Sequence, residues 1–168
     1  IVLGVYIGTI VLLNIPSVQQ VMSVFVAEEL SDLLNTRVTI GRINIGLLNR
    51  IIIDDVLLDD QDEQEMLKVT RLSAKFDIMP FFKGKISISS VQLFGFNINL
   101  QKKTPDSPPN FKFVLDAFAS NDTVKKDNSL DLRINSILIR RGRMAYHVLS
   151  EEETPGKFNA KHVQLQNI

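Results

Sequence analysis

Hydrophobic and polar residues alternate along most of the chain after Thr36, which is typical of strands with one apolar side and one polar side. The alternating runs are 38–45, 50–58, 66–78, 85–93, 94–100 and 130–139. β-branched residues dominate these runs, and Asn, Gly and Asp residues separate them. The pattern predicts a mainly β fold with short helices, in which hairpins repeat along a curled antiparallel sheet.

Two of the longer stretches nearly repeat one another. "GKISISSVQLFGFNINL" covers Gly84–Leu100, and "LDLRINSILIRRGRMAY" covers Leu130–Tyr146, so that Ile86 aligns with Leu132 and a glycine follows soon after each aligned block. Repeats with a period of roughly 45 residues form elongated stacks in which each unit buries a face on its neighbour. We therefore expect the two stretches to be successive units of one wall.

The repeated strands each place apolar residues on one face. Strict alternation puts Phe94 and Phe96 on the same side, with Gly95 on the other as a kink or bulge. Two short helices cannot cover so many apolar strand faces, which leaves two readings: a closed sandwich or barrel core, or an open groove whose apolar side receives acyl chains. The residues expected to line such a groove are Phe94, Phe96, Ile98, Leu100, Leu132, Ile134, Leu138 and Met144.

The first 15 residues predict an apolar helix. No charge occurs from Ile1 to Leu13, but a spanning helix needs about 20 apolar residues. We interpret residues 1–15 as the distal part of a transmembrane anchor; a buried core helix and the hydrophobic region of a secretory signal are the alternatives. The anchor residues are Ile1, Val2, Leu3, Val5, Tyr6, Ile7, Ile10, Val11, Leu12 and Leu13.

Residues 16–35 predict an amphipathic helix. Apolar side chains such as Val21 and Phe25 recur near helical spacing, and Gln19, Gln20, Ser23, Glu28 and Asp32 form a polar face. That polar face has no Lys or Arg, which helices lying on a bilayer usually carry. We therefore expect the apolar face to pack on the sheet. A shorter helix is expected over residues 110–120, with Asn110 as its N-cap, and the groove domain extends over residues 36–168.

Composition and motifs narrow the function further. Lys plus Arg number 19, as do Asp plus Glu, so nothing marks a nucleic-acid binder, and the absence of Cys excludes disulfides and thiolate sites. His147 and His162 lie far apart in sequence and match no metal-binding motif, so we interpret His147 as solvated. The Asp pairs 54–55 and 59–60 fit turns, and the arginines of "IRRGR" at 139–143 fit an exposed turn. We predict a protein that is not an enzyme and needs no cofactor or metal.

The chain resembles the N-terminal end of the TamB proteins, which belong to the AsmA-like group. The resemblance rests on "LSDLLNTRVTIGRINIGLLNRIIIDDVLLDD", on "GKISISSVQLFGFNINL" and on "NFKFVLDAFAS…LDLRINSILIRRGRMAY", and it covers essentially the whole chain. It implies a single-pass protein of the inner membrane of diderm bacteria, with its β-domain in the periplasm. It also implies the start of an elongated, groove-shaped β structure, similar in architecture to the chorein-type bridge proteins of eukaryotes.

The resemblance further implies phospholipid as cargo and transport toward the outer membrane. A second role implied for the family is outer-membrane protein assembly with a barrel of the Omp85 class, which this family contacts through a C-terminal region that is not in this chain. Three hypotheses follow: a lipid-conducting groove anchored to the inner membrane, a scaffold that captures client strands at a sheet edge, and a closed β-domain that acts as a spacer.

Overall fold

The computed structural model describes all residues except 1, 47–48, 78–85, 121–129 and 132–135. Helices α1 (Val2–Leu13) and α2 (Pro16–Leu34) come first, and α4 (Lys112–Ser120) lies between two groups of strands. Pro16 occupies the first turn of α2, where its fixed φ suits a helix start. Asn35 ends α2 in the left-handed conformation, with its N–H donating to the Ser31 carbonyl.

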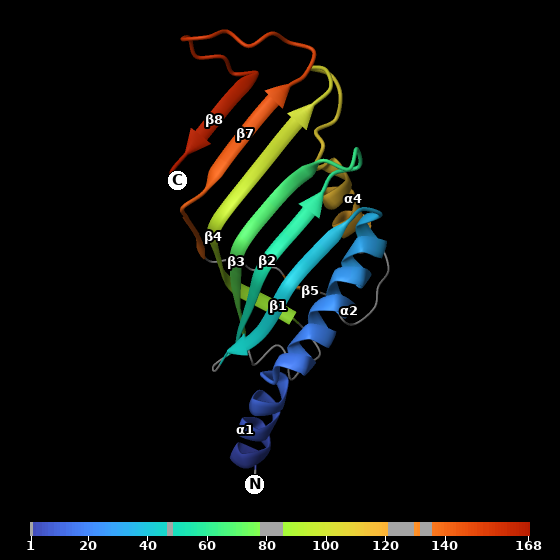
Figure 1. Ribbon diagram of the computed structural model, residues 1–168, viewed down its shortest axis with the longest axis vertical. Coiled ribbons are helices and arrows are strands. Elements are labelled where there is room, and N and C mark those ends of the chain that lie inside the picture. Colours follow the sequence, from blue (N-terminus) through green and yellow to red (C-terminus); the bar gives the residue numbers. More distant parts are fainter. Residues whose placement is uncertain (1, 47–48, 78–85, 121–129, 132–135) are drawn as a thin grey trace.

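The strands form one curled, mixed sheet (Figure 1). They are β1 (Val38–Gly46), β2 (Arg50–Asp59), β3 (Glu65–Phe76), β4 (Ile86–Lys102), β5 (Leu130–Asp131), β6 (Ser136–Arg140), β7 (Arg143–Val148) and β8 (His162–Gln166). The spatial order is β1-β2-β3-β4-β7-β8, and β5 and β6 pair with β4. The mainly β fold with short helices is therefore confirmed.

The sheet is not antiparallel throughout, as repeating hairpins would require. β1 to β4 form an antiparallel meander and β7 pairs antiparallel with β8, but β5, β6 and β7 all run parallel to β4. The chain reaches this parallel position through the segment that contains α4, because parallel neighbours need a crossover connection. The hairpin expectation was wrong at this junction.

The two similar stretches of sequence are direct neighbours in the sheet. Ser90 pairs with Ser136 and Lys102 pairs with Val148, at the same offset that aligns the two sequences. A parallel register at this offset places equivalent residues beside one another on the same face. The repetition in sequence is therefore a repetition in space, across β4 and the continuous line of β6 and β7.

Helix α2 lies along the outer edge of β1 (Figure 1), and the side that it presents to this edge carries polar and small residues. Gln19 Nε2 donates to Asn44 Oδ1 at 2.7 Å, and the Val38 N–H donates to Ser31 Oγ at 3.0 Å. Ser23, between them on the same stripe, is 1% exposed. These side chains occupy the edge, where an uncovered strand presents unpaired backbone groups.

This arrangement reverses the expected orientation of α2. Val21, Val24 and Phe25 are 69%, 50% and 60% exposed, whereas Gln19 and Ser23 are buried. The expectation that the apolar face packs on the sheet was wrong, because β1 offers α2 a backbone edge that polar side chains satisfy better than aliphatic ones. Among the apolar residues of α2, Ala27 and Leu34 are buried, and Leu30 packs against the core cluster that contains Leu34.

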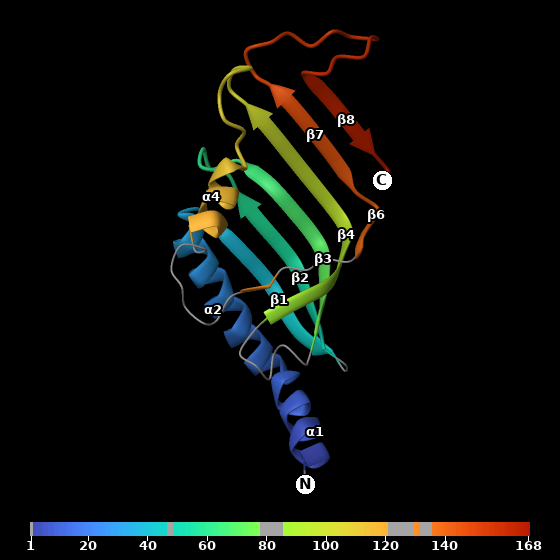
Figure 2. The same cartoon turned by 180° about the vertical axis from the view of Figure 1, so that it is seen from behind.

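The hydrophobic core lies where α2 and α4 meet the ends of the first three strands (Figure 2). Its buried members are Leu34, Val38, Leu58 and Met66, and the partly buried residues packed against them are Leu30, Leu67, Phe111, Phe113, Val114 and Ala117. Both helices thus contribute to one cluster, which holds α4 against one face of the sheet.

Candidate functional site: the apolar face of the sheet

Three rows of paired residues form an apolar face on the half of the sheet nearer α4. Residues paired across neighbouring strands point to the same side of a sheet, so each row can be followed from strand to strand. The rows are Ile40, Val56, Val69 and Phe96; Val38, Leu58, Leu67, Ile98, Met144 and Leu165; and Leu100, Tyr146 and Val163. Val69 is 0% exposed and Phe96 is 5% exposed.

The other half of the sheet has two further apolar rows. They are Ile43, Ile53, Leu72, Leu93 and Ile139, and Ile45, Ile51, Ala74, Val91 and Ile137. The row between them faces the opposite side and is polar at three of its five positions: Asn44, Ile52, Ser73, Gln92 and Leu138. The row on the other side of Ile43 also faces that side and is polar at four of its five positions: Arg42, Asp54, Arg71, Phe94 and Arg140. Ile137 and Ile139 are 60% and 42% exposed, so the apolar rows remain accessible on β6.

The positions that face the apolar side change phase between the two halves. In β2, for example, they are Ile51 and Ile53 in one half but Val56 and Leu58 in the other. Where strict alternation holds, these residues could not share a face. Every strand from β1 to the β6–β7 line makes the same three-residue step at the same height in the sheet.

A single transverse row of residues, which we name the crease, produces this step: Gly41, Asp55, Thr70, Gly95 and Arg141. The paired residues on either side place these five residues opposite one another. Asp55, Gly95 and Arg141 have φ values of 55°, 63° and 55°. Left-handed residues interrupt a strand as a β-bulge does and bend it locally.

Side-chain contacts show that the crease and the row beside it both face the polar side. Arg71 Nε donates to Asp54 Oδ1 at 2.6 Å on that side, and the Arg141 guanidinium lies 5.3 Å from the ring centroid of Phe94. Two successive residues on one side shift the alternation by one. The apolar rows of the two halves therefore lie on the same side, and the apolar face is continuous across the crease.

The residues expected to line a groove divide between the two faces. Phe96, Ile98, Leu100 and Met144 lie on the apolar face, whereas Phe94 and Leu138 lie on the opposite face. The difference arises at Gly95, because its left-handed conformation reverses the alternation on which the expectation rested. Leu132 and Ile134 lie outside the described residues.

Val91, Leu93, Ile137 and Ile139 belong to the apolar face but escaped sequence reasoning. A signal for them exists: in "VQLFGFNI" the apolar positions Val91 and Leu93 are followed by Phe96 and Ile98, with a three-residue step around Gly95. A glycine at such a step indicates a change of phase rather than a simple kink.

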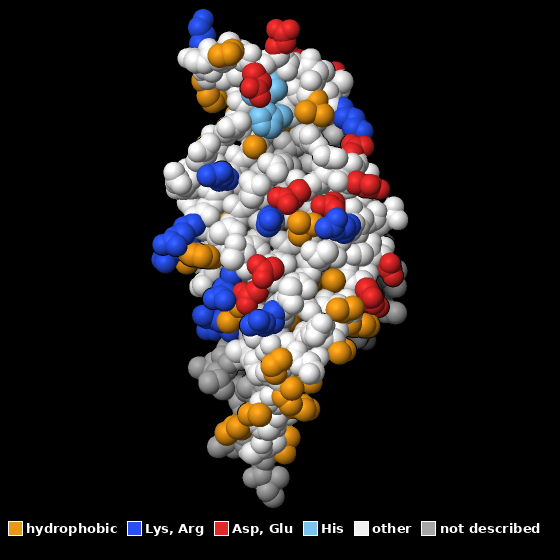
Figure 3. Space-filling model, in the orientation of Figure 1, with side chains coloured by type: hydrophobic (Ala, Val, Ile, Leu, Met, Phe, Trp, Pro, Cys, Tyr) orange, Lys and Arg blue, Asp and Glu red, His pale blue; other side chains and the backbone are white. Residues whose placement is uncertain are grey.

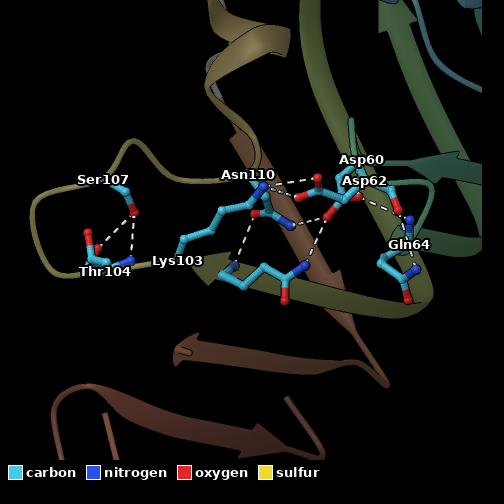
Figure 4. Close-up of polar contacts among 8 residues, drawn as sticks. Asp60, Asp62, Gln64, Lys103, Thr104, Ser107 and Asn110 are labelled. Atoms are coloured by element: carbon cyan, nitrogen blue, oxygen red, sulfur yellow. Dashed lines mark hydrogen bonds and ion pairs between the residues drawn. The ribbon is translucent and has the colours of Figure 1, made fainter. Parts of the chain in front are cut away.

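A buried carboxylate fixes the segment that leads into α4 (Figure 4). Asp60 is 1% exposed, and its Oδ1 accepts the backbone N–H groups of Asp62 at 2.9 Å and Gln64 at 3.0 Å. Its Oδ2 accepts the side-chain amides of Gln101 and Asn110, each at 3.0 Å. Burial alone raises the pKa of Asp60, but these four hydrogen bonds outweigh it and lower the pKa below its usual value.

Asn110 connects this carboxylate to β4. Its Oδ1 accepts the Gln101 N–H at 3.0 Å, and its Nδ2 also donates to the Asn99 carbonyl at 3.2 Å. The expectation that Asn110 caps α4 was wrong, since its amide holds the preceding loop to the sheet instead. This contact sets where α4 begins, and α4 in turn covers one end of the apolar face.

The polar side carries most of the charged residues of the strands. Figure 3 shows this side, which faces away from α4, with Lys, Arg, Asp and Glu side chains spread across it. The two histidines form one patch there. Their ring centroids lie 5.4 Å apart because His147 pairs with His162 across β7 and β8, although the two residues are far apart in sequence.

The N-terminal helices add a second exposed apolar region. In α1 and the turn that follows it, Val5, Ile7, Val11, Leu12 and Ile15 are between 41% and 66% exposed. Among the described residues no single helix is long and apolar enough to cross a bilayer; Ile7–Leu13 and Pro16–Leu34 reach that length only together, across a bend of 71°.

Comparison with protein-family models, with curated proteins and with solved structures found no match for this chain.

Proposed function

We propose that the apolar face of the sheet is a groove that carries the acyl chains of phospholipids, in a protein anchored to the inner membrane. The observation that carries this proposal is the continuity of the apolar rows across the crease. In a closed β-domain the apolar residues of the sheet would be buried in the hydrophobic core, but Ile137, Ile139 and Leu165 are 60%, 42% and 48% exposed. A lipid carrier requires an uninterrupted apolar lining of this kind.

The energetics of lipid transport support a groove without a specific polar site. Exposing an acyl chain to water costs about 0.8 kcal/mol for each CH₂ group. A continuous lining removes that cost along the whole path, and a lipid slides most easily where no tight polar contact holds it. The candidate groove fits this requirement, since its rows consist of aliphatic and aromatic residues supplied by β1 to β4 and β6 to β8.

The exposed apolar residues of α1 and of the first half of α2 support the membrane anchor. Val21, Val24 and Phe25 of α2 are exposed as the apolar residues of α1 are, and the acidic residues Glu28 and Asp32 follow on the same face of α2. This order fits an anchor that leaves the bilayer near the break between α1 and α2, since α2 already contacts β1 at Gln19, and it places Val21, Val24 and Phe25 at the membrane surface. In the proposed arrangement the sheet stands in the periplasm of a diderm bacterium and directs lipid toward the outer membrane.

Neighbouring residues of β6 offer a matched test. Ile139→Glu places a charge on the apolar face, and Leu138→Glu places the same charge on the opposite face at 41% rather than 42% exposure. The Ser136 and Ser90 hydroxyls bond at 2.9 Å on the opposite face, which supports this assignment of sides. The two variants therefore differ in which face of the sheet carries the new charge and in little else.

The assay is phospholipid recovered with the purified chain, measured by mass spectrometry, together with binding of a fluorescent phosphatidylethanolamine. We expect Ile139→Glu to lose at least tenfold in bound lipid and Leu138→Glu to remain within twofold of wild type. Equal binding by all three proteins, or no lipid on wild type, would contradict the proposal; the second outcome favours a spacer domain.

A second candidate function is a scaffold for the assembly of outer-membrane proteins with an Omp85-type barrel. One observation favours it: β8 pairs with β7 on one side only among the described strands, so its other edge offers unpaired backbone groups. A photo-crosslinker at Gln164, exposed on β8, distinguishes the two functions. Crosslinks to unfolded barrel proteins support the scaffold, and their absence alongside lipid binding supports the groove.

A further inference from the structure

Two histidines and a glutamate converge at the far end of the sheet, away from the apolar face. His147 lies on β7 and His162 on β8, where they form a cross-strand pair, and Glu153 belongs to the connection between these strands. Their ligand atoms all lie within 4.8 Å of one another. The lipid groove makes no use of them, because row order places His147 on the polar side with Gln101.

The three atoms form a triangle of the size that a zinc ion requires. His147 Nδ1 lies 3.1 Å from His162 Nδ1, and Glu153 Oε1 lies 3.6 Å and 3.9 Å from these two nitrogens. The point equidistant from all three atoms is about 2.1 Å from each, which equals the usual Zn–N and Zn–O bond lengths. An ion can therefore contact all three ligands without movement of the backbone.

A backbone contact prepares one of the histidines for this role. His162 Nε2 lies 2.9 Å from the Glu151 carbonyl, an acceptor, so this nitrogen carries the proton and the lone pair of Nδ1 points toward His147 Nδ1, which donates to it at 3.1 Å. Metal-bound histidines commonly donate their second N–H to a carbonyl in this way. Glu151 is held in turn by Lys161, whose Nζ lies 2.6 Å from Glu151 Oε1.

The orientation of the two imidazole rings shows how they must move for zinc to bind. With ring centroids 5.4 Å apart and Nδ1 atoms 3.1 Å apart, the two nitrogens face one another directly. For zinc to bind, each imidazole must turn toward Glu153, and the proton of His147 must lie on Nε2 so that both Nδ1 lone pairs reach the same ion. His147 and His162 side chains are 26% and 10% exposed, while Glu153 is 68% exposed, so the carboxylate is free to approach from solvent.

We propose that His147, Glu153 and His162 bind a divalent zinc ion, with water at the fourth position, and that the ion joins the β7–β8 connection to the strands. Two imidazoles and one carboxylate suit zinc rather than calcium or magnesium, which prefer oxygen ligands alone. The ion would close the loop of residues 149–161, because its ligands lie before, within and after that loop. The site stabilises the edge strand β8 and is separate from lipid binding.

The test is zinc binding to the full chain without a histidine tag, after removal of metals with EDTA. Isothermal titration with ZnCl₂ should give one saturable site per chain, and the melting temperature should rise with zinc because the ion binds the folded state. Cobalt(II) should give the visible absorption of a four-coordinate site. Glu153→Gln keeps the size of an exposed side chain, and we expect it to weaken zinc binding about tenfold or more.

Glu152→Gln is the matched control, since Glu152 is the exposed neighbour of Glu153 and does not belong to the triangle. Its zinc affinity should stay within twofold of wild type. His147→Gln should abolish the site while circular dichroism shows an unchanged sheet. Absence of saturable zinc uptake, or equal affinity in the Glu153 and Glu152 variants, overturns the proposal.

Discussion

Replacement of Gly95 by alanine tests whether the crease depends on a left-handed residue. Gly95 has a φ of 63°, and a β-carbon added there would lie 2.7 Å from Thr70 Oγ1 and 3.0 Å from Thr70 Cβ. The conformation costs a residue other than glycine about 1–2 kcal/mol, and overpacking of this kind costs about 1–3 kcal/mol. We expect Gly95→Ala to lower the free energy of unfolding by about 2–5 kcal/mol, from the sum of these effects.

Gly156→Ala separates the two contributions. Gly156 has a φ of 75°, but a β-carbon there would meet nothing within 4 Å, so only the conformational cost of about 1–2 kcal/mol applies. Urea denaturation followed by circular dichroism measures both variants. A double-mutant cycle with Thr70→Ala should recover about 1 kcal/mol of the loss at Gly95, because the hydroxyl that crowds the new methyl group is gone.

Two results would refute this reasoning. If Gly95→Ala and Gly156→Ala destabilise the chain equally, contact with Thr70 contributes nothing. If Gly95→Ala leaves stability within about 0.5 kcal/mol of wild type, the strand does not need a left-handed residue at this position, and the continuity of the apolar face must have another cause.

Three further predictions follow from the polar contacts and the exposed helix face. Asp60→Asn should cost about 2 kcal/mol in urea denaturation, because an amide cannot accept all four hydrogen bonds that the charged carboxylate receives. The pKa of Asp60 is lower in the folded chain than its ordinary 3.8, so its contribution is present above that value and is lost as the pH falls below it; acid titrations of wild type should show this loss and those of Asp60→Asn should not. Phe25→Ser should leave the melting temperature unchanged, since the side chain is 60% exposed, but should reduce co-sedimentation with phospholipid vesicles; an unchanged vesicle-bound fraction would count against the membrane contact of α2.

Alternation and propensity in the sequence predicted the β-rich fold, a short helix over residues 110–120, which is observed at Lys112–Ser120, and the similarity of the two strand units. These features are local, or repeat locally. The parallel register also follows the sequence alignment closely, since Ser90 pairs with Ser136. Pairing direction was not predictable in the same way, because the chain between β4 and β6 is long enough to allow either direction.

Other features depend on long-range contacts that a single strand or helix does not reveal. The polar stripe of α2 is buried because β1 offers an open backbone edge, and helical periodicity alone cannot distinguish a stripe that covers an edge from one that faces water. The two histidines meet because β7 and β8 pair with a particular register. Sequence separation gave no indication of that register.

The glycines of the two similar units illustrate the same limit. Gly95 and Gly142 look like equivalent members of a repeat, yet the register places Gly95 opposite Arg141 and Phe96 opposite Gly142. Gly95 supplies a left-handed conformation, whereas Gly142 provides space: a β-carbon there would lie 1.9 Å from the ring of Phe96. The second unit instead adopts the left-handed conformation at Arg141, with a φ of 55°.

The crease also makes the sheet resistant to misalignment. In an ordinary sheet a strand can slip by two residues and still present the same side chains to the same face, because alternation has a period of two. Here such a slip would move a left-handed residue out of the crease. Over the displaced stretch, polar side chains would then face the apolar side and apolar side chains the polar side. The crease therefore permits one alignment of the five strand segments that it crosses. A deletion of one residue next to the crease would change the pairing of that strand with each of its neighbours.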